Sequence, residues 1–497
     1  MPDTSGYGYD IRDDDTLVGD DNSSVSSLGS ASTLVSEGAN PGPGLPNIRP
    51  HIDHRVDVAI IGSGITAVGV ALSILPLMAS RGMAPDVFVF EAMGLCSEGA
   101  AQHDALMSFL SYRVFRPDGG LLPEKVLNFQ VKSAEALKEL ESKYLDADAR
   151  EFEMEDLYYN DEDFEFGRRT QRRLDELYPQ YGATILEGDE VPHYGPLRAR
   201  GARTHTARLV RLYRLVTSIW ADLRTQYANL RISTNNYVRH IALTTGSSHP
   251  YIVTCSRGSI QARHVVHATD SYAPRLLPAL EIGLTAGRKH RLLLRPGARF
   301  PKREGKHIWA LHLGRHPFTV IRLPGGNDEI DELLIDRGWV VSGGRDHREM
   351  ISTVNHIYYY MERVFGPEWK EAEITPELRS STIGITGDSL PFVGRIPRDY
   401  TNRGVWSSEQ AAVGAPFSDD GGLATPGEWI SAGYGGLGMA FALFSGHAVG
   451  IQIAGMENEE LEMVPGRPGG RLNDWFPKEE LSLDGDRMMR ANFVPLD

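Results

Sequence analysis

The chain has 497 residues, of which 41% are hydrophobic and 24% charged, and its formal net charge is −15. This length exceeds what one hydrophobic core usually supports, and the acidic balance argues against nucleic acid as a partner. Only two cysteines are present and no apolar run is long enough to span a bilayer, so we expect a cytoplasmic protein with no disulfide framework and no membrane partner.

Residues 1–50 form the first distinct segment. They are rich in Ser, Gly, Asp and Pro and poor in aromatic residues. A segment of this kind buries too little apolar surface to offset its ordering entropy. We therefore expect a disordered acidic, Ser-rich tail.

The first nucleotide-binding signal follows directly. Val56–Ile61 is a β-branched run that predicts a buried strand, and it leads into the turn Gly62–Ala67, a G-x-G-x-x-A pattern, and an apolar helix. Gly62 permits the tight turn, Gly64 lets the backbone approach a pyrophosphate, and Ala67 lets the helix pack on the strand, while the helix N-terminus offers free N–H groups to phosphate. The residues expected at a dinucleotide from this motif are Gly62, Gly64, Ile65 and Thr66.

A second predicted strand, "DVFVF", ends at Glu91 and Ala92. Glu91 stands 27 residues after Gly64 (91 − 64), somewhat later than the usual spacing of about 20. A carboxylate at this position accepts hydrogen bonds from ribose hydroxyls and repels a 2′-phosphate. The motif therefore predicts a dinucleotide, with NADP the least expected one.

A second glycine-rich region lies near the far end of the chain. "GITGDSLPFVGRIP", Gly384–Pro397, precedes "GEWISAGYGGLGMAFALFSGHAVGIQIAG", Gly427–Gly455, which predicts a strand, a glycine-dense turn and a helix. Such a turn exposes backbone N–H groups that could hold the edge of a flavin ring, which favours FAD over NAD. The alternative for this stretch alone is a glycine-rich packing turn.

Four stretches together resemble the D-amino acid oxidase/glycine oxidase superfamily of FAD-dependent oxidoreductases, especially its sarcosine-oxidase-like and fungal-type members. They are "VAIIGSGITAVGVAL…VFVFEA", "VVHATDSYAPRLLPAL", "GITGDSLPFVG" and "AGYGGLGM". The resemblance implies an α/β fold, in which a Rossmann-like FAD-binding domain carries an inserted antiparallel-sheet α+β substrate domain. The expected FAD-binding segments are 51–111, 201–284 and 376–497, and the expected substrate segments are 112–200 and 285–375.

The resemblance also implies further cofactor contacts. Val238 stands where the family makes a backbone contact to adenine, and Leu437 replaces a histidine that is common in the family. The remaining residues implied at FAD are Ala92, Ala268, Thr269, Asp388, Gly435, Gly436, Gly438 and Met439.

His103, in the loop "EGAAQHDAL", has two interpretations. Its position matches the histidine that bonds covalently to flavin in the dimethylglycine and sarcosine dehydrogenase branch, so it could carry an 8α-histidyl link to FAD. Its neighbours Gln102 and Asp104 differ from that branch, and the alternative is a neutral histidine hydrogen-bonded within the loop. Cys96, just upstream, is expected to be buried filler.

The implied chemistry is oxidation of a C–N bond in an amine or amino-acid-like small molecule. Hydride would pass to flavin N5, and O2 or an electron carrier would reoxidise the flavin. By resemblance Lys289 is the candidate for stabilising developing superoxide, with Arg288 beside it, although a surface cation cluster is the alternative. Arg379 is the weaker candidate for binding an acidic substrate.

Three further expectations complete the analysis. The acidic run from Arg150 to Gly167 is expected to be solvated surface. No Cys/His spacing indicates zinc, so no metal is expected. Because the residues at 102, 104 and 437 depart from the family, a flavin-binding scaffold without turnover is the alternative to an active enzyme, and oligomeric state is left open.

Overall fold

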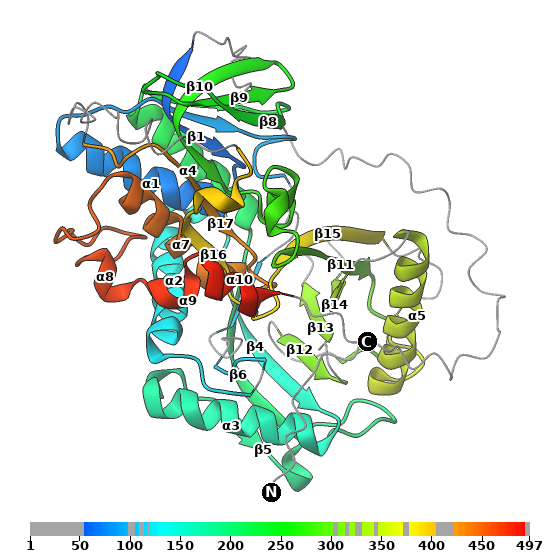
Figure 1. Cartoon of the computed structure of the whole chain (residues 1–497). Helices are drawn as coiled ribbons and strands as arrows, with labels where there is room; N and C mark the ends of the chain where they lie inside the picture. The colour runs from blue at the N-terminus through cyan, green and yellow to red at the C-terminus, as the bar shows by residue number, and fades with distance from the viewer. Residues whose placement is uncertain are drawn as a thin grey trace, which may run out of the picture.

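The computed structural model describes residues 54–97, 105–108, 114–117, 119–301, 307–313, 318–323, 331–341, 346–370, 377–403 and 422–492. Within these residues the chain builds one eight-stranded sheet and one nine-stranded sheet, here called the first and the second sheet. Figure 1 shows the two sheets with helices packed around them. None of the described helices is both long and apolar enough to cross a bilayer.

The first sheet has a parallel core with the strand order β16-β17-β10-β1-β2-β7, and β8 and β9 extend from β10 as an antiparallel pair. Only β16 runs antiparallel within the main order. Residues 58–61 of β1 and the whole of β2 are continuous apolar runs, which is typical of strands covered on both faces. Its strands are β1 Arg55–Ile61, β2 Val87–Phe90, β7 Leu230–Ser233, β8 Val238–Leu243, β9 Tyr251–Cys255, β10 Gly258–His267, β16 Phe392–Arg395 and β17 Gly427–Ala432.

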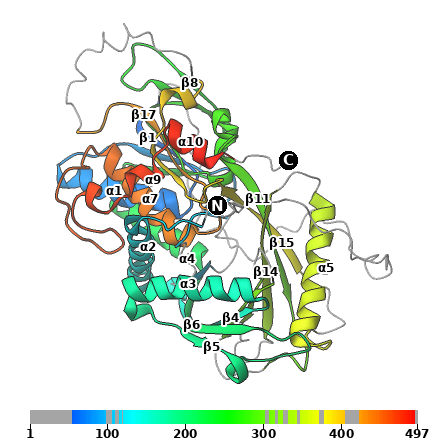
Figure 2. The ribbon, with the colours of Figure 1, turned by 60° about the horizontal axis from the view of Figure 1, so that its bottom comes forward.

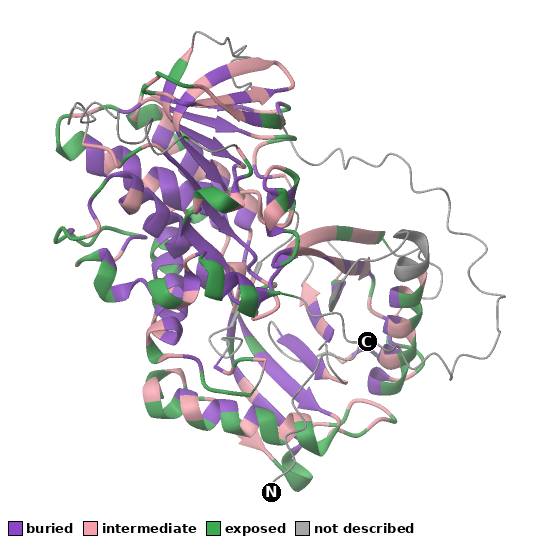
Figure 3. Ribbon diagram, in the orientation of Figure 1, coloured by how far each residue is buried: buried purple, intermediate pink, exposed green. Residues whose placement is uncertain are grey.

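Two apolar helices, α1 (Ile65–Ser80) and α7 (Gly438–Ile453), pack closely on this sheet. A Cβ at Gly69 would lie 2.4 Å from the carbonyl oxygen of Leu443, and a Cβ at Gly446 would lie 2.2 Å from that of Thr66. Further along both helices Gly450 approaches Val70, so the two helices run parallel and begin at the same edge of the sheet. Figure 3 shows this layer as the most continuously buried part of the molecule.

The remaining helices lie around this core and the second sheet. α2 packs against α7, and α4 packs against α1. Their bounds are α2 Glu124–Lys143, α3 Asp161–Leu177, α4 Leu212–Gln226, α5 Asp346–Phe365, α8 Leu472–Trp475, α9 Lys478–Leu481 and α10 Gly485–Ala491. Short 3-10 turns are η3 Leu145–Ala147, η4 Pro179–Tyr181, η5 Gly188–Glu190, η6 Asp270–Arg275, η7 Pro278–Leu280 and η8 Arg398–Tyr400.

The second sheet has the order β15-β11-β14-β13-β12-β4-β6-β3, with β5 also paired to β6. All its pairs are antiparallel except β12 with β4. Its strands are β3 Ala105–Ser108, β4 Arg150–Tyr158, β5 Thr184–Leu186, β6 Gly201–Val210, β11 Thr285–Leu294, β12 His307–His312, β13 Phe318–Leu323, β14 Glu332–Val341 and β15 Glu377–Ile385.

One face of the second sheet packs against α5. Leu292 and Ile335 meet Ile357 and Met361 of that helix in one buried cluster. Figures 1 and 2 place α5 on the side of the sheet away from α1 and α7. Because strand side chains alternate between faces, the residues between these apolar positions point to the opposite face, here called the inner face.

The expected fold class is confirmed: a Rossmann-like α/β unit is combined with a second, mostly antiparallel sheet. The boundaries between the segments differ in detail from expectation. β3, β6 and β15 fall in segments expected in the FAD-binding domain but pair in the second sheet, and α2 falls in a segment expected in the substrate domain but packs on α7.

The acidic run is not solvated surface throughout, so that expectation is wrong in part. Its first half forms β4, in which Glu155 is fully buried and Asp156 is 3% exposed. The hydroxyl of Tyr194 donates a hydrogen bond to Glu155 at 2.6 Å, and Arg203 of β6 donates one to Asp156 at 2.6 Å, so both carboxylates have partners inside the protein. A run of acidic letters does not reveal such partners.

Candidate active site

The first glycine turn joins β1 to α1 and has two glycines with different roles. Gly62 has φ +104°, and a Cβ there would lie 2.4 Å from the carbonyl oxygen of Ala268. Gly64 has no heavy atom within 4 Å of its Cβ position. No side chain caps the first turn of α1, so its N–H groups face the space next to Gly64. Gly62 therefore serves the fold, whereas Gly64 borders open space at a helix N-terminus.

Glu91 lies at the end of β2 beside this turn. The hydroxyl of Ser63 donates to its Oε2 at 2.6 Å, and the backbone N–H of Met93 donates to its Oε1 at 3.0 Å. Ser63 Oγ in turn accepts the backbone N–H of Cys96 at 2.8 Å. Cys96 itself is buried, and burial raises the pKa of its thiol. The carboxylate of Glu91 is thus held next to the loop that carries Gly64, while Ala92 is exposed.

The second glycine turn lies between β17 and α7. Gly433, Gly435 and Gly436 all have φ between +57° and +88°, a conformation that other residues adopt with strain. The side chain of Tyr434 is buried, and its hydroxyl lies 2.7 Å from Thr66 Oγ1 and 2.7 Å from Ser431 Oγ. The hydrogen bond between Tyr434 and Thr66 connects the second glycine turn to the start of α1.

The positions of Gly435 and Gly438 are open on their Cβ side, with no heavy atom within 4 Å. Gly436 is exposed, and Leu437 and Met439 are half-buried. The second turn therefore borders free space at the edge where α1 and α7 both begin.

Three further predicted residues lie at strand ends of the first sheet. Ala268 follows β10, and its N–H donates to the carbonyl of Ile61 at 2.9 Å. The hydroxyl of the next residue, Thr269, is buried and has no hydrogen-bond partner within the described residues. Val238 begins β8 and is half-buried. An unsatisfied hydroxyl beside two open glycine turns fits a bound polar group.

Asp270 was not predicted to contact the cofactor, although it lies within the quoted stretch "VVHATDSYAPRLLPAL". It has φ +45°, its Oδ2 accepts the N–H of Gly384 at 2.6 Å, and its Oδ1 accepts the N–H of Gly433 at 2.8 Å. Burial raises the pKa of Asp270, and these backbone N–H groups counteract that rise. The only signal in the sequence is an acidic residue at a position that needs a positive φ.

Asp388 lies in a different environment from the glycine turns. It forms an ion pair with Arg487 of α10, whose guanidinium is fully buried. Burial lowers the pKa of Arg487 to about 10. Arg487 also donates to the carbonyl of Leu390 at 2.6 Å, so this pair fixes the loop after β15. Sequence reasoning missed Arg487 because nothing local marks it.

The loop that carries His103 lies outside the described residues. The chain is described again from Ala105, where β3 pairs with β6 at the edge of the second sheet. The two interpretations of His103 therefore keep their standing as predictions.

Lys289 lies on the inner face of β11. Its Nζ is 2.7 Å from Asp336 Oδ2, and the Nε of Arg291 is 2.9 Å from the same oxygen. Burial alone would raise the pKa of Asp336, but the charges of Lys289 and Arg291 hold it below its ordinary value. Ala286 of β11 pairs with Gly384 of β15. Lys289 is three residues after Ala286 and therefore lies about 10 Å along β11 from the position opposite Gly384.

The other cations of this region are placed as follows. Arg288 is half-buried and points to the face of β11 opposite to that of Lys289. Arg379 pairs across the strands with Arg291, and its Nε lies 2.6 Å from Glu377 Oε1 in an exposed ion pair. The inner face thus combines Lys289, Arg291 and Arg379 with the carboxylate of Asp336.

A second charged cluster on the inner face surrounds Asp156. Its Oδ2 accepts Arg203 Nη2 at 2.6 Å and lies 3.1 Å from His205 Nε2, and its Oδ1 lies 3.0 Å from His312 Nε2. The ring of His312 stacks on Tyr158 at 4.3 Å. Burial would raise the pKa of Asp156, but Arg203 and the two histidines hold it well below its ordinary value.

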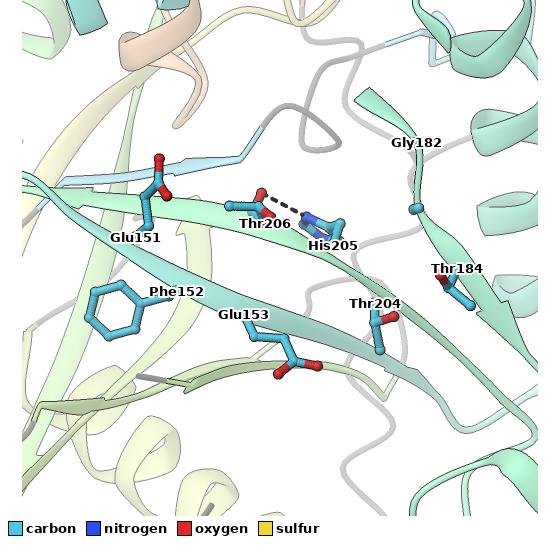
Figure 4. A pocket seen from close by; sticks show the side chains of 9 residues that line it. Glu151, Phe152, Glu153, Gly182, Thr184, Thr204, His205 and Thr206 are labelled. Carbon is cyan, nitrogen blue, oxygen red and sulfur yellow. Dashed lines mark hydrogen bonds between the residues drawn. The ribbon is translucent and has the colours of Figure 1, made fainter. Parts of the chain in front are cut away.

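A cavity of about 700 Å³ lies on the second sheet, and Figure 4 shows the side chains that line it. It is bordered by Glu151 and Glu153 of β4 and by Thr204 and Thr206 of β6. None of its lining residues belongs to either glycine turn. This cavity is therefore not the candidate cofactor site.

A parallel sheet whose first turn offers glycine backbone and a helix N-terminus, with a carboxylate at the end of the next strand, defines the class of dinucleotide-binding proteins. The FAD dependent oxidoreductase family model matches residues 57–450. The chain therefore belongs to this family of FAD-dependent oxidoreductases.

Solved structures with the same fold share little sequence with this chain. Glycine oxidase from Geobacillus kaustophilus is 15% identical with a TM-score of 0.59, over 83% of this chain and 98% of that protein. L-amino acid deaminase from Proteus vulgaris is 14% identical with a TM-score of 0.57, over 87% and 98%. L-proline dehydrogenase from P. horikoshii is 16% identical with a TM-score of 0.57, over 81% and 94%. Comparison with curated protein sequences gives no match.

The described residues fit FAD. Gly64, Gly435 and Gly438 leave their Cβ positions open at one edge of the first sheet, and the Thr269 hydroxyl lies unsatisfied beside them. The carboxylate of Glu91 at the end of β2 could accept hydrogen bonds from ribose hydroxyls. The uncapped first turn of α1 could donate N–H groups to a pyrophosphate.

Proposed function

We propose that this chain oxidises a C–N bond of an amine or amino-acid-like small molecule. The observation that carries the proposal is the pair of glycine turns, tied together by the Thr66–Tyr434 hydrogen bond and open on the side of Gly64 and Gly435. Glycine oxidase, L-amino acid deaminase and L-proline dehydrogenase share the fold, and their names indicate amino acid substrates.

Bound FAD supplies a hydride acceptor at its N5 atom. The chain's own residues bind and orient: the first turn of α1 and Gly64 would hold the pyrophosphate, Glu91 the ribose, and Val238 the adenine through its backbone. Ala268, Thr269 and the turn from Gly435 to Met439 would lie along the flavin. Because the protein would hold the cofactor against one face of the substrate, the reaction between them becomes effectively unimolecular.

Lys289 is the proposed catalytic residue for reoxidation by O2. Its ammonium group would stabilise the negative charge that develops on oxygen, and Asp336 holds the ammonium in place at 2.7 Å. Arg291 and Arg379, on the same face, offer positive charge to a substrate that carries a carboxylate.

The test uses the purified chain loaded with FAD. Amines and amino acids from a panel are added one at a time without oxygen. A compound that bleaches the yellow absorbance of the protein has reduced the flavin and is a substrate. Admitting air and measuring hydrogen peroxide then separates an oxidase from a dehydrogenase. If no compound bleaches a fully loaded protein, the alternative of a flavin-binding protein without turnover is favoured. Leu437, which stands where a histidine is common in the family, is the described residue that supports that alternative.

The covalent attachment of FAD to His103 is part of this proposal. Attachment would replace one 8α C–H bond of the flavin with a bond to the neutral imidazole nitrogen of His103. The two hydrogens and two electrons released would stay with the reduced flavin, which O2 would then reoxidise to give H2O2. Acid precipitation, followed by mass spectrometry of the peptide containing His103, tests it. Yellow colour in the pellet and a flavin-sized mass increment are the expected results, and free FAD in the supernatant with an unmodified peptide overturns the attachment.

A further inference from the structure

Three chain segments meet at the carboxylate of Asp270. Asp270 follows β10 of the first sheet, Gly433 follows β17 of the same sheet, and Gly384 belongs to β15 of the second sheet. One carboxylate oxygen accepts the N–H of Gly384 at 2.6 Å and the other accepts that of Gly433 at 2.8 Å. A single side chain therefore joins the two sheets and the second glycine turn.

The fit around this carboxylate leaves little space. A Cβ at Gly384 would lie 2.6 Å from Asp270 Oδ1, and a Cβ at Gly433 would lie 2.8 Å from Thr386 Cγ2. The N–H of Gly435 also donates to the carbonyl of Gly384 at 2.8 Å. The second turn is thus held against β15 both directly and through Asp270.

We propose that Asp270 is a positioning residue that docks the second sheet onto the first and fixes the second glycine turn for the flavin end of the cofactor. The part that concerns flavin rests on the proposed function. Both oxygens of the carboxylate are in use, so an amide in its place turns an NH2 group toward one of the two donors. Asp270 also has a positive φ, which only Gly, Asn and Asp adopt readily.

The key variant is Asp270→Gly, because glycine keeps the backbone conformation and removes only the carboxylate. Asp148→Gly is the matched control: Asp148 has φ +46°, is half-buried and lies at the end of η3, away from both glycine turns. We measure the FAD dissociation constant, the fine structure of the flavin absorption band, and amide hydrogen exchange of the protein without FAD.

We expect Asp270→Gly to weaken FAD binding by about tenfold or more, as loss of charge-assisted hydrogen bonds implies, and to blur the flavin band. Exchange should quicken in the peptides that contain Gly384 and Gly433, whereas Asp148→Gly should change none of these. Asp270→Asn retains one acceptor and should quicken exchange at one of the two amides. The Asn variant therefore separates the two halves of the contact.

The outcomes of the proposal and of the proposed function are distinguishable. Asp270→Gly with unchanged exchange at both glycines and unchanged FAD affinity overturns the role of Asp270. A native chain that binds no FAD overturns the proposed function instead, and the exchange data still decide whether Asp270 joins the two sheets. Faster exchange with unchanged FAD affinity overturns the part that concerns the flavin.

Discussion

Strands β1 and β2 of the first sheet place their polar groups differently from the strands of the second sheet. In the first sheet, strands β1 and β2 bury apolar side chains along almost their whole length, and the groups suited to a cofactor lie in the turns that follow: Gly64, Glu91 and Thr269. In the second sheet, Asp156 and Asp336 lie within strands, buried on the inner face. β1 and β2 therefore act as a scaffold for the turns that follow them, whereas β4 and β14 of the second sheet carry buried carboxylates within the strands themselves.

The largest expected effect tests the turns of the first sheet. Gly64→Val should abolish FAD binding while the protein still folds, because the Cβ position of Gly64 is open and its φ of −71° suits any residue. The measurements are FAD content after purification and thermal unfolding. A Gly64→Val protein that stays fully loaded would show that the cofactor lies elsewhere.

Gly62→Ala is the matched control for that prediction. A Cβ at Gly62 would lie 2.4 Å from the backbone of Ala268, at φ +104°. We expect this variant to give a lower yield of folded protein, and not only a lower FAD content. If both variants behaved alike, the division between a structural and a cofactor-facing glycine would be wrong.

The second prediction tests the strands of the second sheet. Asp336→Asn should destabilise the fold by about 3–5 kcal/mol, the usual cost of removing one partner of a buried ion pair, because Lys289 and Arg291 lose their shared anion. Glu377→Gln, which breaks the exposed pair with Arg379, should cost about 0–1 kcal/mol. Denaturant unfolding of both variants checks the contrast, and equal effects would contradict the buried role of Asp336.

The third prediction separates stability from chemistry on the same face. Lys289→Met should slow reoxidation of reduced flavin by O2 about 100-fold, the scale of removing one preorganised charge from a developing anion. Flavin reduction by substrate should change little. Stopped-flow traces of the two half-reactions decide this, and Arg288→Met serves as the control because Arg288 lies on the opposite parity of β11. Equal slowing of both half-reactions would remove Lys289 from the oxygen step.

The same contrast between turns and strand interiors decides which parts of the molecule could be predicted from the sequence. The run from Val56 to Thr66 could be predicted because a buried strand, a tight turn and a helix start are all specified by neighbouring residues. Asp336 and Asp156 could not, because an acidic residue in a strand is buried or exposed according to strand register and to which face α5 covers. Asp270 falls between the two cases: the quoted stretch "VVHATDSYAPRLLPAL" contains it, but its partners at 384 and 433 come together only in the fold.

The smallest expected effect is a pH dependence that also belongs to the second sheet. The pKa of Asp156 is held well below its ordinary value in the folded protein, whereas in the unfolded chain it returns to about 3.9. The unfolded chain therefore binds the proton first, and the stability from this group is present above about pH 4 and is lost as pH falls toward the folded pKa. Asp156→Asn should cost about 3–5 kcal/mol near neutral pH, because Arg203 loses its buried anion, and its deficit relative to the native chain should shrink on acidification. Urea unfolding at several pH values measures this, with Glu151→Gln as an exposed control from the same strand. A deficit that stays constant with pH would mean that Asp156 acts through packing and not through its charge.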